Sequence, residues 1–233
     1  MAEYLTDLGI GDYKIIQDTD GYCFSQDSVL LANLAKLGGR DRVLDLGCGS
    51  GILATLALIK KGVSCAVGVE IQPELCDMAK RSAKLNGLDM EIINCDVKDI
   101  KRHIEAESFD KALCNPPYFV SPSPSKAGAS GIARTESAAT LDDFIKAAGY
   151  SLKFGGDLYI IIKAARLQTL MASLERHGLA AKEITLIYPK LSHGVDAVIV
   201  GAKKGGKEGL TTKTFVAQNE DGAFTSEYLQ LYS

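Results

Sequence analysis

The chain has 233 residues, of which 46% are apolar, and a formal net charge of −3. These values predict one α/β domain and exclude a globally basic protein, although a local basic groove is compatible with the total charge. No apolar run approaches the roughly 20 residues that cross a bilayer, and the opening residues lack the apolar segment of a signal peptide. The six cysteines are scattered without a CxxC pair, which favours buried, reduced thiols in a cytoplasmic protein over zinc or disulfides.

In chain order, the pattern predicts a short strand at 13–16 and then a helix at 28–37, capped by Ser25 or Asp27 and closed by Gly38-Gly39. Apolar runs typical of buried strands follow at 43–46, 66–70, 90–95, 109–114, 157–162, 184–188 and 197–200. Helices are predicted between them at 52–61, from Pro73 to Asn86-Gly87, at 141–153 with an end near Gly155-Gly156, and at 167–177.

This alternation predicts a doubly wound, mostly parallel sheet. The last two strands leave no room for a helix between them, so they are expected to form an antiparallel hairpin at one edge. We expect three segments: residues 1–39 covering the ligand site, a main domain at 40–204, and a polar, Gly-rich tail at 205–233 packed on the same domain.

A glycine-rich loop from Asp45 to Gly51 joins the first strand of the main domain to its helix. Its glycines allow positive φ angles and a close approach of the backbone to a ligand. The dinucleotide pattern GxGxxG is not met, because the third glycine comes one residue early and Ile52 follows it. The loop therefore predicts a ligand site but disfavours a nicotinamide or flavin enzyme.

Acidic residues close the next two strands. Glu70 is placed to accept hydrogen bonds from both ribose hydroxyls of an adenosine. Asp96 is placed to accept one from the exocyclic amine of an adenine, with the backbone N–H of Val97 beside it. If the strand order is 3-2-1-4-5, these residues, the glycine loop and the end of the fourth strand share one crevice at the carboxyl ends of the strands.

The fourth strand ends in Asn115-Pro116-Pro117-Tyr118. The side-chain oxygen of Asn115 and the carbonyl of Pro116 can both accept hydrogen bonds from a planar NH2 group and direct its nitrogen lone pair out of the ring plane. The prolines hold these acceptors rigid, because each fixes its own φ and Pro117 also restricts Pro116. The Tyr118 ring can stack on a planar substrate. The motif therefore predicts alkyl transfer to an NH2 group.

Together these residues resemble the class I S-adenosylmethionine-dependent methyltransferases, in the branch that methylates planar NH2 groups. Across nearly the whole chain, the resemblance is to the bacterial tRNA1(Val) adenine-37 N6-methyltransferase family. The supporting stretches are 14–17, 21–27, 133–136 and 221–228. Two positions depart from the family pattern: Cys114 stands where Asp is common, and Thr135 stands where His is expected.

The resemblance implies a Rossmann-like sheet of seven strands in the order 3-2-1-4-5-7-6, with the last strand antiparallel. It implies S-adenosylmethionine as cofactor, tRNA as partner, no metal, no membrane, and a monomer or weak dimer. The implied cofactor contacts are Gln26, Asp27, Asp45, Gly47, Cys48, Gly49, Gly51, Glu70, Ile71, Asp96, Val97 and Asn115. The implied catalytic residues are Asn115, Pro116, Pro117 and Tyr118. The implied substrate contacts are Tyr118, Phe119 and Arg134.

Several other functions remain open. Glutamine N5-methylation of a protein such as a release factor uses the same kind of NH2 group, but it predicts an added N-terminal docking domain. DNA adenine methylation predicts a larger target-recognition region. An RNA-binding or assembly factor that binds the cofactor without turnover would not need the side chain of Asn115.

Overall fold

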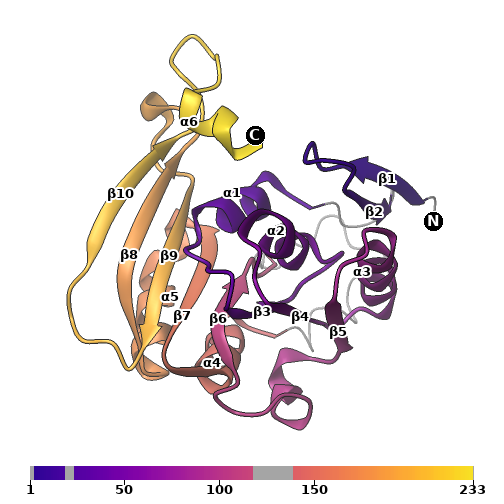
Figure 1. The fold of residues 1–233 in the computed structure, drawn as a ribbon. Coiled ribbons are helices and arrows are strands. Elements are labelled where there is room, and N and C mark those ends of the chain that lie inside the picture. Colours follow the sequence, from indigo (N-terminus) through magenta and orange to yellow (C-terminus); the bar gives the residue numbers. More distant parts are fainter. Residues whose placement is uncertain (1–2, 19–23, 118–138, 233) are drawn as a thin grey trace, which may run out of the picture.

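In the computed structural model of the chain, the structure describes residues 3–18, 24–117 and 139–232. A central sheet of eight strands has the order β10-β8-β9-β7-β6-β3-β4-β5 (Figure 1). Its strands are β3 (Arg42–Leu46), β4 (Cys65–Glu70), β5 (Met90–Asn94), β6 (Phe109–Cys114), β7 (Leu152–Lys163), β8 (Leu179–Tyr188), β9 (Ala197–Lys204) and β10 (Thr211–Val216). Strand β9 is antiparallel to both of its neighbours, and the other pairs are parallel. The predicted order of the seven strands is confirmed.

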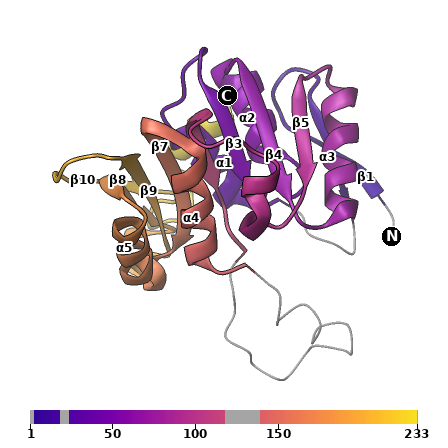
Figure 2. The same cartoon turned by 90° about the horizontal axis from the view of Figure 1, so that it is seen from below.

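Helices cover both faces of this sheet (Figure 1; Figure 2). They are α1 (Gln26–Leu34), α2 (Ile52–Lys61), α3 (Pro73–Leu85), α4 (Leu141–Ser151), α5 (Leu167–Arg176) and α6 (Ser226–Leu229). Short 3-10 turns are η1 (Val97–Arg102), η2 (Ala164–Arg166), η3 (Leu191–His193) and η4 (Gln230–Tyr232). None of the helices in the described part of the chain is both long and apolar enough to cross a bilayer.

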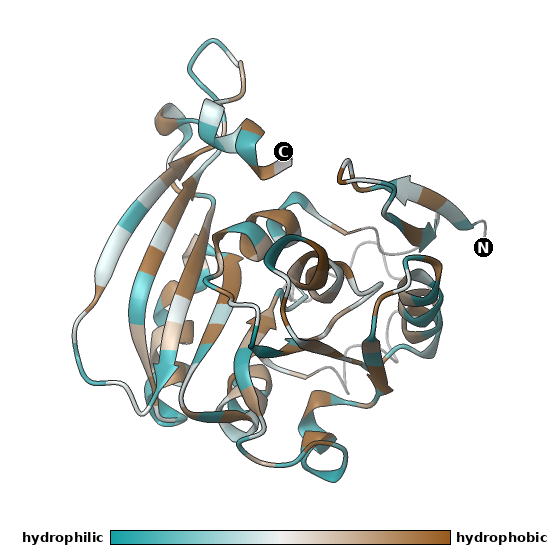
Figure 3. Ribbon diagram, viewed as in Figure 1, coloured by the Kyte–Doolittle hydropathy of each residue, from teal (hydrophilic) through white to brown (hydrophobic). Residues whose placement is uncertain are grey.

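The strands send alternate side chains into two hydrophobic cores, as the period of two requires. Val43 and Leu113 face the core formed with α1 and α2, whereas Leu44 and Ala112 face the core formed with η1, α4 and α5. Figure 3 shows hydrophobic residues concentrated in β3, β4 and α2, while α3 is mostly hydrophilic. Burial on both faces explains why the central strands read as continuous apolar runs.

The predicted edge position of the β8–β9 hairpin is wrong, because β10 pairs in parallel with β8 and becomes the edge strand. Four of the six residues of β10 are exposed, so its sequence lacks the apolar run of a buried strand. Phe215 is fully buried and fixes β10 to the core that contains α1 and α2.

A separate hairpin of β1 (Glu3–Asp7) and β2 (Lys14–Asp18) packs on α3. Strand β1 is mostly exposed and was not predicted. The Ile16 backbone N–H donates to Ser82 Oγ at 2.9 Å, and Ile16 contacts the α3 residues Leu75 and Met78. The hairpin therefore extends the α3 side of the domain beyond β5.

Two predicted helix ends are wrong. Helix α1 ends at Leu34, because Ala35 already has an extended backbone, so Gly38-Gly39 does not close it. Helix α4 ends at Ser151, and Leu152 pairs with Phe109 as the first residue of β7. Backbone pairing with β6 thus replaces the predicted helical end near Gly155-Gly156.

Candidate active site

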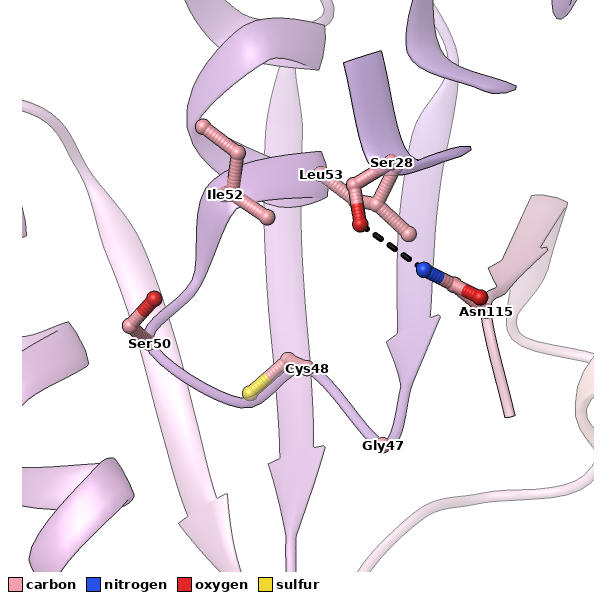
Figure 4. Close-up of a pocket in the computed structure, with 7 residues that line it drawn as sticks. All are labelled: Ser28, Gly47, Cys48, Ser50, Ile52, Leu53 and Asn115. Carbon is pink, nitrogen blue, oxygen red and sulfur yellow. Dashed lines mark hydrogen bonds between the residues drawn. The ribbon is translucent and has the colours of Figure 1, made fainter. Parts of the chain in front are cut away.

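The sheet reverses its direction of strand addition at β3, which lies between β4 and β6. The loops after β3 and β6 therefore leave the sheet side by side, which is where ligands bind in doubly wound folds. One pocket lies at this point (Figure 4), and it is lined by Ser28, Gly47, Cys48, Ser50, Ile52, Leu53 and Asn115. The predicted convergence of the glycine loop and Asn115 is confirmed.

The glycine loop is held in a fixed shape by its own backbone. Gly47, Gly49 and Gly51 have φ angles of 73°, 56° and 85°, so each occupies the left-handed region where a side chain is strained. The backbone N–H groups of Gly47 and Cys48 both donate to the Val69 carbonyl of β4, at 2.8 and 3.0 Å. At Gly47, a Cβ atom would lie 3.1 Å from the ring of Phe144.

The side chain of Cys48 packs against Gly68 of β4 and so fixes the glycine loop on the sheet. A Cβ atom on Gly68 of β4 would lie 2.7 Å from Cys48 Sγ and 2.8 Å from Ile92 Cδ1, so a glycine is needed there. Burial, followed by the charges of Asp45 and Glu70, raises the pKa of the Cys48 thiol well above its usual value. The thiol is therefore neutral and acts by packing. The described cysteines, Cys48, Cys65, Cys76, Cys95 and Cys114, are all free.

Asp45 is fully buried in β3, beneath the first turn of α2. Its Oδ2 accepts a hydrogen bond from the Ala54 backbone N–H at 3.2 Å, while Oδ1 has no partner among the described residues. Burial raises the pKa of Asp45 to about 7; the Ala54 N–H opposes this shift and the charge of Glu70 adds to it. A cationic group placed beside Oδ1 would favour the ionised carboxylate.

Glu70 ends β4 and supports the glycine loop. One of its carboxylate oxygens accepts from the Gly49 backbone N–H at 3.0 Å, and the other accepts from the Gln72 N–H at 2.9 Å. Each oxygen keeps a second lone pair for a ligand hydroxyl. Ile71, the next residue, has a half-exposed side chain, which leaves an apolar surface beside the carboxylate.

Asp96 follows β5 and is the N-terminal cap of η1. Its Oδ1 accepts from the Lys98 backbone N–H at 2.9 Å, and its Oδ2 lies 3.2 Å from Lys98 Nζ. Val97 is buried next to it. The two residues follow the strand beside β4, so they continue the row of predicted contacts at the carboxyl ends of the strands.

Asn115 is buried directly after β6. Its Nδ2 donates to Ser28 Oγ at 2.9 Å and lies 3.4 Å from Ser25 Oγ (Figure 4). Its Oδ1 has no partner among the described residues. Pro116 is buried and Pro117 is exposed. Within the described part of the chain, the Asn115 oxygen is thus a buried acceptor without a donor.

The remaining predicted residues divide into two groups. Gln26 and Asp27 form the start of α1, directly before the pocket residue Ser28. Tyr118, Phe119 and Arg134 lie outside the described residues, so their roles stay predictions. Sequence reasoning did not select Ser28 or Gly68. The one available signal for Ser28 was a polar residue at the start of the apolar run from Val29 to Ala32.

The family model of the methyltransferase small domain matches residues 24–183, more than half of the chain. The chain belongs to this family. The methyltransferase is also similar to a solved structure, a predicted O-methyltransferase of Agrobacterium tumefaciens, with a TM-score of 0.71 and 23% identity. The match covers 88% of this chain and 95% of that one. The predicted class I methyltransferase fold is confirmed.

Several relatives carry the name tRNA1(Val) (adenine(37)-N6)-methyltransferase. The protein of Shewanella halifaxensis is 28% identical over 72% of this methyltransferase and 70% of its own length. The protein of Aeromonas hydrophila is 22% identical over 89% and 87% of the two chains. Another relative, from Methanocaldococcus jannaschii, has the name of a protein N5-glutamine methyltransferase and is 36% identical over 41% and 46% of the two chains.

Proposed function

We propose that this methyltransferase transfers the methyl group of S-adenosylmethionine to the exocyclic N6 amine of an adenine in tRNA, with A37 of tRNA1(Val) as the expected position. The observation that carries the proposal is the buried Oδ1 of Asn115, which has no partner among the described residues. Buried acceptors nearly always have a donor, so a buried acceptor of a pocket residue that has none among the described residues is matched to a ligand donor. The names of the Shewanella and Aeromonas relatives support tRNA as the carrier of that donor.

The site fits the proposed cofactor. Asp45 Oδ1, which has no partner in the described parts of the chain, suits a cationic group, and the left-handed glycines leave the loop without side chains where a ligand would lie against it. Glu70 offers free lone pairs to ribose hydroxyls. Asp96 and Val97 continue this row at the next strand. S-adenosylmethionine, when bound, supplies an electrophilic methyl group.

The residues of the chain act on the acceptor nitrogen. An aromatic NH2 group is a poor nucleophile because its lone pair is delocalised into the ring. Hydrogen bonds from that group to Asn115 Oδ1 and the Pro116 carbonyl favour the pyramidal nitrogen, and they strengthen as positive charge develops on it. The proton can leave to solvent after methyl transfer, so the proposal needs no dedicated general base. Stacking of the base on Tyr118 stays a prediction.

A second candidate is N5-methylation of a glutamine side chain in a protein. The name of the Methanocaldococcus relative favours it, and a glutamine amide is also a planar NH2 group. Asn115 would accept from either substrate, so the acceptor geometry alone does not distinguish adenine methylation from glutamine methylation. A methyl-transfer assay with both substrates distinguishes them.

The test is methyl transfer from labelled S-adenosylmethionine to unmodified bulk tRNA and, in parallel, to a release factor. We expect label in tRNA, recovered as N6-methyladenosine. Asn115→Ala is expected to lower the rate about 100-fold or more, because it removes an acceptor used in the transition state. Asn219→Ala, at an exposed site, is the matched control. Label in the release factor alone would overturn the tRNA proposal.

The cytoplasmic location, the monomeric or weakly dimeric state and the three-segment division of the chain stay predictions. In the described residues, no group of three or more His, Cys, Asp and Glu side chains is arranged to hold a metal ion.

A further inference from the structure

Ser28 is a buried polar residue on the face of α1 that meets the sheet. It is 3% exposed, and its Oγ is the 2.9 Å partner of Asn115 Nδ2. The two residues are separated by 87 positions in the chain, so only the tertiary fold brings them together. Ser28 also lines the pocket at the switch point (Figure 4).

Helix α1 holds Ser28 in a fixed place. Leu31 is fully buried in the core shared with α2, and the residues on either side of it, Leu30 and Ala32, are also buried. The Asn33 carbonyl accepts from Lys61 Nζ of α2 at 3.0 Å. The Ser28 hydroxyl therefore has little freedom to move relative to β6.

The carboxamide of Asn115 has two nearly isosteric orientations, and they are opposite in chemistry. They exchange the positions of the acceptor Oδ1 and the donor Nδ2. A substrate NH2 group needs Oδ1 as its acceptor. If the Asn115 Nδ2 group faced it instead, neither NH2 group would have a hydrogen-bond partner. In the structure the Nδ2 group donates to Ser28, and Oδ1 is the atom that has no partner among the described residues.

We propose that Ser28 is a positioning residue that holds the Asn115 carboxamide by its nitrogen and so keeps Oδ1 for the substrate. Ser28 Oγ accepts the Nδ2 hydrogen in the structure, whereas the second orientation needs the Ser28 hydroxyl to turn and donate to Oδ1, which leaves the substrate without this acceptor. Ser25 Oγ, at 3.4 Å from the same nitrogen, gives secondary support. This inference rests on the proposed methyl transfer to an NH2 group, and it assigns a catalytic contribution to the segment that precedes the main domain.

The first measurement does not depend on activity. The side-chain NH2 resonances of Asn115 in 15N-labelled protein are assigned by their disappearance in Asn115→Ala. We expect their exchange with water to be at least about 10-fold slower than that of the exposed Asn219, because the group is buried and bonded. Ser28→Ala is expected to accelerate it. Equal exchange rates of the Asn115 NH2 group in the wild type and in Ser28→Ala would overturn the inference. This result does not depend on whether the protein methylates tRNA.

The second measurement is steady-state methyl transfer. Ser28→Ala is expected to lower kcat about 10- to 100-fold with little change in KM for S-adenosylmethionine, and Ser28→Thr, which keeps the hydroxyl, is expected to recover most of that loss. Ser25→Ala should have a smaller effect. Ser151→Ala is the matched control, because Ser151 is a buried serine of α4 and does not line the pocket.

A double-mutant cycle separates positioning from a general effect on folding. If Ser28 acts through Asn115, Ser28→Ala causes no further loss of kcat in the Asn115→Ala background. An independent, multiplicative loss in the double variant would show that Ser28 acts on the fold or on the ligand directly. That result would overturn the positioning role and leave the tRNA proposal standing.

Discussion

Two regions of the sheet differ in whether their polar side chains have partners. The site edge consists of the carboxyl ends of β3, β4 and β6 with the glycine loop, and the outer half consists of β7, β8, β9 and β10. At the site edge, Asp45 Oδ1, Ser50 Oγ and Asn115 Oδ1 are buried and lack partners among the described residues. In the outer half, the carboxylates of Asp157 and Glu183 each contact two lysines.

The polar groups at the site edge lower the stability of the fold and are kept for ligand binding, whereas those of the outer half stabilise the fold. A buried polar group without a partner costs about 1–3 kcal/mol, so the site edge is less stable than its apolar content suggests. The outer half has no such cost at its paired carboxylates. We therefore expect substitutions in the two regions to change ligand binding and folding independently.

Phe215→Ala tests whether the outer half can lose stability alone. The side chain is fully buried between β10 and the core. Its removal is expected to lower the free energy of unfolding by about 3–5 kcal/mol. The measurement is urea unfolding, with Phe154→Ala as control because Phe154 is 76% exposed. Cofactor affinity of the folded variant should match the wild type; a parallel loss would show that the regions are coupled.

Asp45→Asn is expected to stabilise the unliganded protein while weakening the cofactor site. Asn keeps an acceptor for the Ala54 N–H but carries no charge. Because the pKa of Asp45 in the fold is about 7 instead of 3.8, wild-type stability falls as pH rises from about 4 to 7. Above pH 7 the variant should be more stable by on the order of 4 kcal/mol, with no difference near pH 4.

Urea unfolding at pH 4, 6 and 8 measures this effect, and titration with S-adenosylmethionine measures affinity, which we expect to fall about 10-fold or more. Asp89→Asn is the control, because Asp89 is exposed. A pH-independent difference between Asp45→Asn and the wild type would contradict the role of the buried charge.

Gly68→Ala tests whether the packing of β4 against the glycine loop affects stability and cofactor binding. The new methyl group would press on Cys48 Sγ and Ile92 Cδ1. We expect a loss of about 1–3 kcal/mol of stability and weaker cofactor binding, since Cys48 belongs to the loop. Adding Cys48→Ala removes the sulfur atom and should restore part of the lost stability and part of the lost cofactor binding. Gly38→Ala is the control, because a Cβ there meets nothing closer than 3.6 Å.

Glu183→Gln should have the smallest effect. Burial raises the pKa of Glu183, but hydrogen bonds and charges from Lys36 and Lys213 outweigh this and hold the pKa below its usual value. Both lysines are largely exposed, so we expect a loss of about 1 kcal/mol or less. The loss is present at neutral pH and disappears as pH falls below about 4, opposite to Asp45.

This effect is measured by urea unfolding at low and high salt, and high salt should reduce it. Glu175→Gln, at an exposed site on α5, is the control. Methyl transfer should be unchanged; a slower reaction in Glu183→Gln would show that the outer half contributes to catalysis.

The sequence predicted the parts of the fold that follow local rules. The apolar runs after Arg42 and before Asn115, with the glycines between, predicted the switch point because periodicity and turn chemistry are local. The partnership of Ser28 with Asn115 was not predictable, since it depends on how α1 packs. Gly68 was missed because its constraint comes from Cys48 across the sheet, and β10 was missed because one buried side chain gives no periodic signal.

The parallel pairing of β10 has a consequence for association between molecules. Strand β8 has ten residues, and without β10 its N–H and C=O groups from Glu183 to Tyr188 would be open to a strand of another chain. Strand β10 is shorter and carries the charged Lys213 among its exposed residues, and both features resist further strand addition. The C-terminal strand therefore protects the sheet from edge-to-edge aggregation.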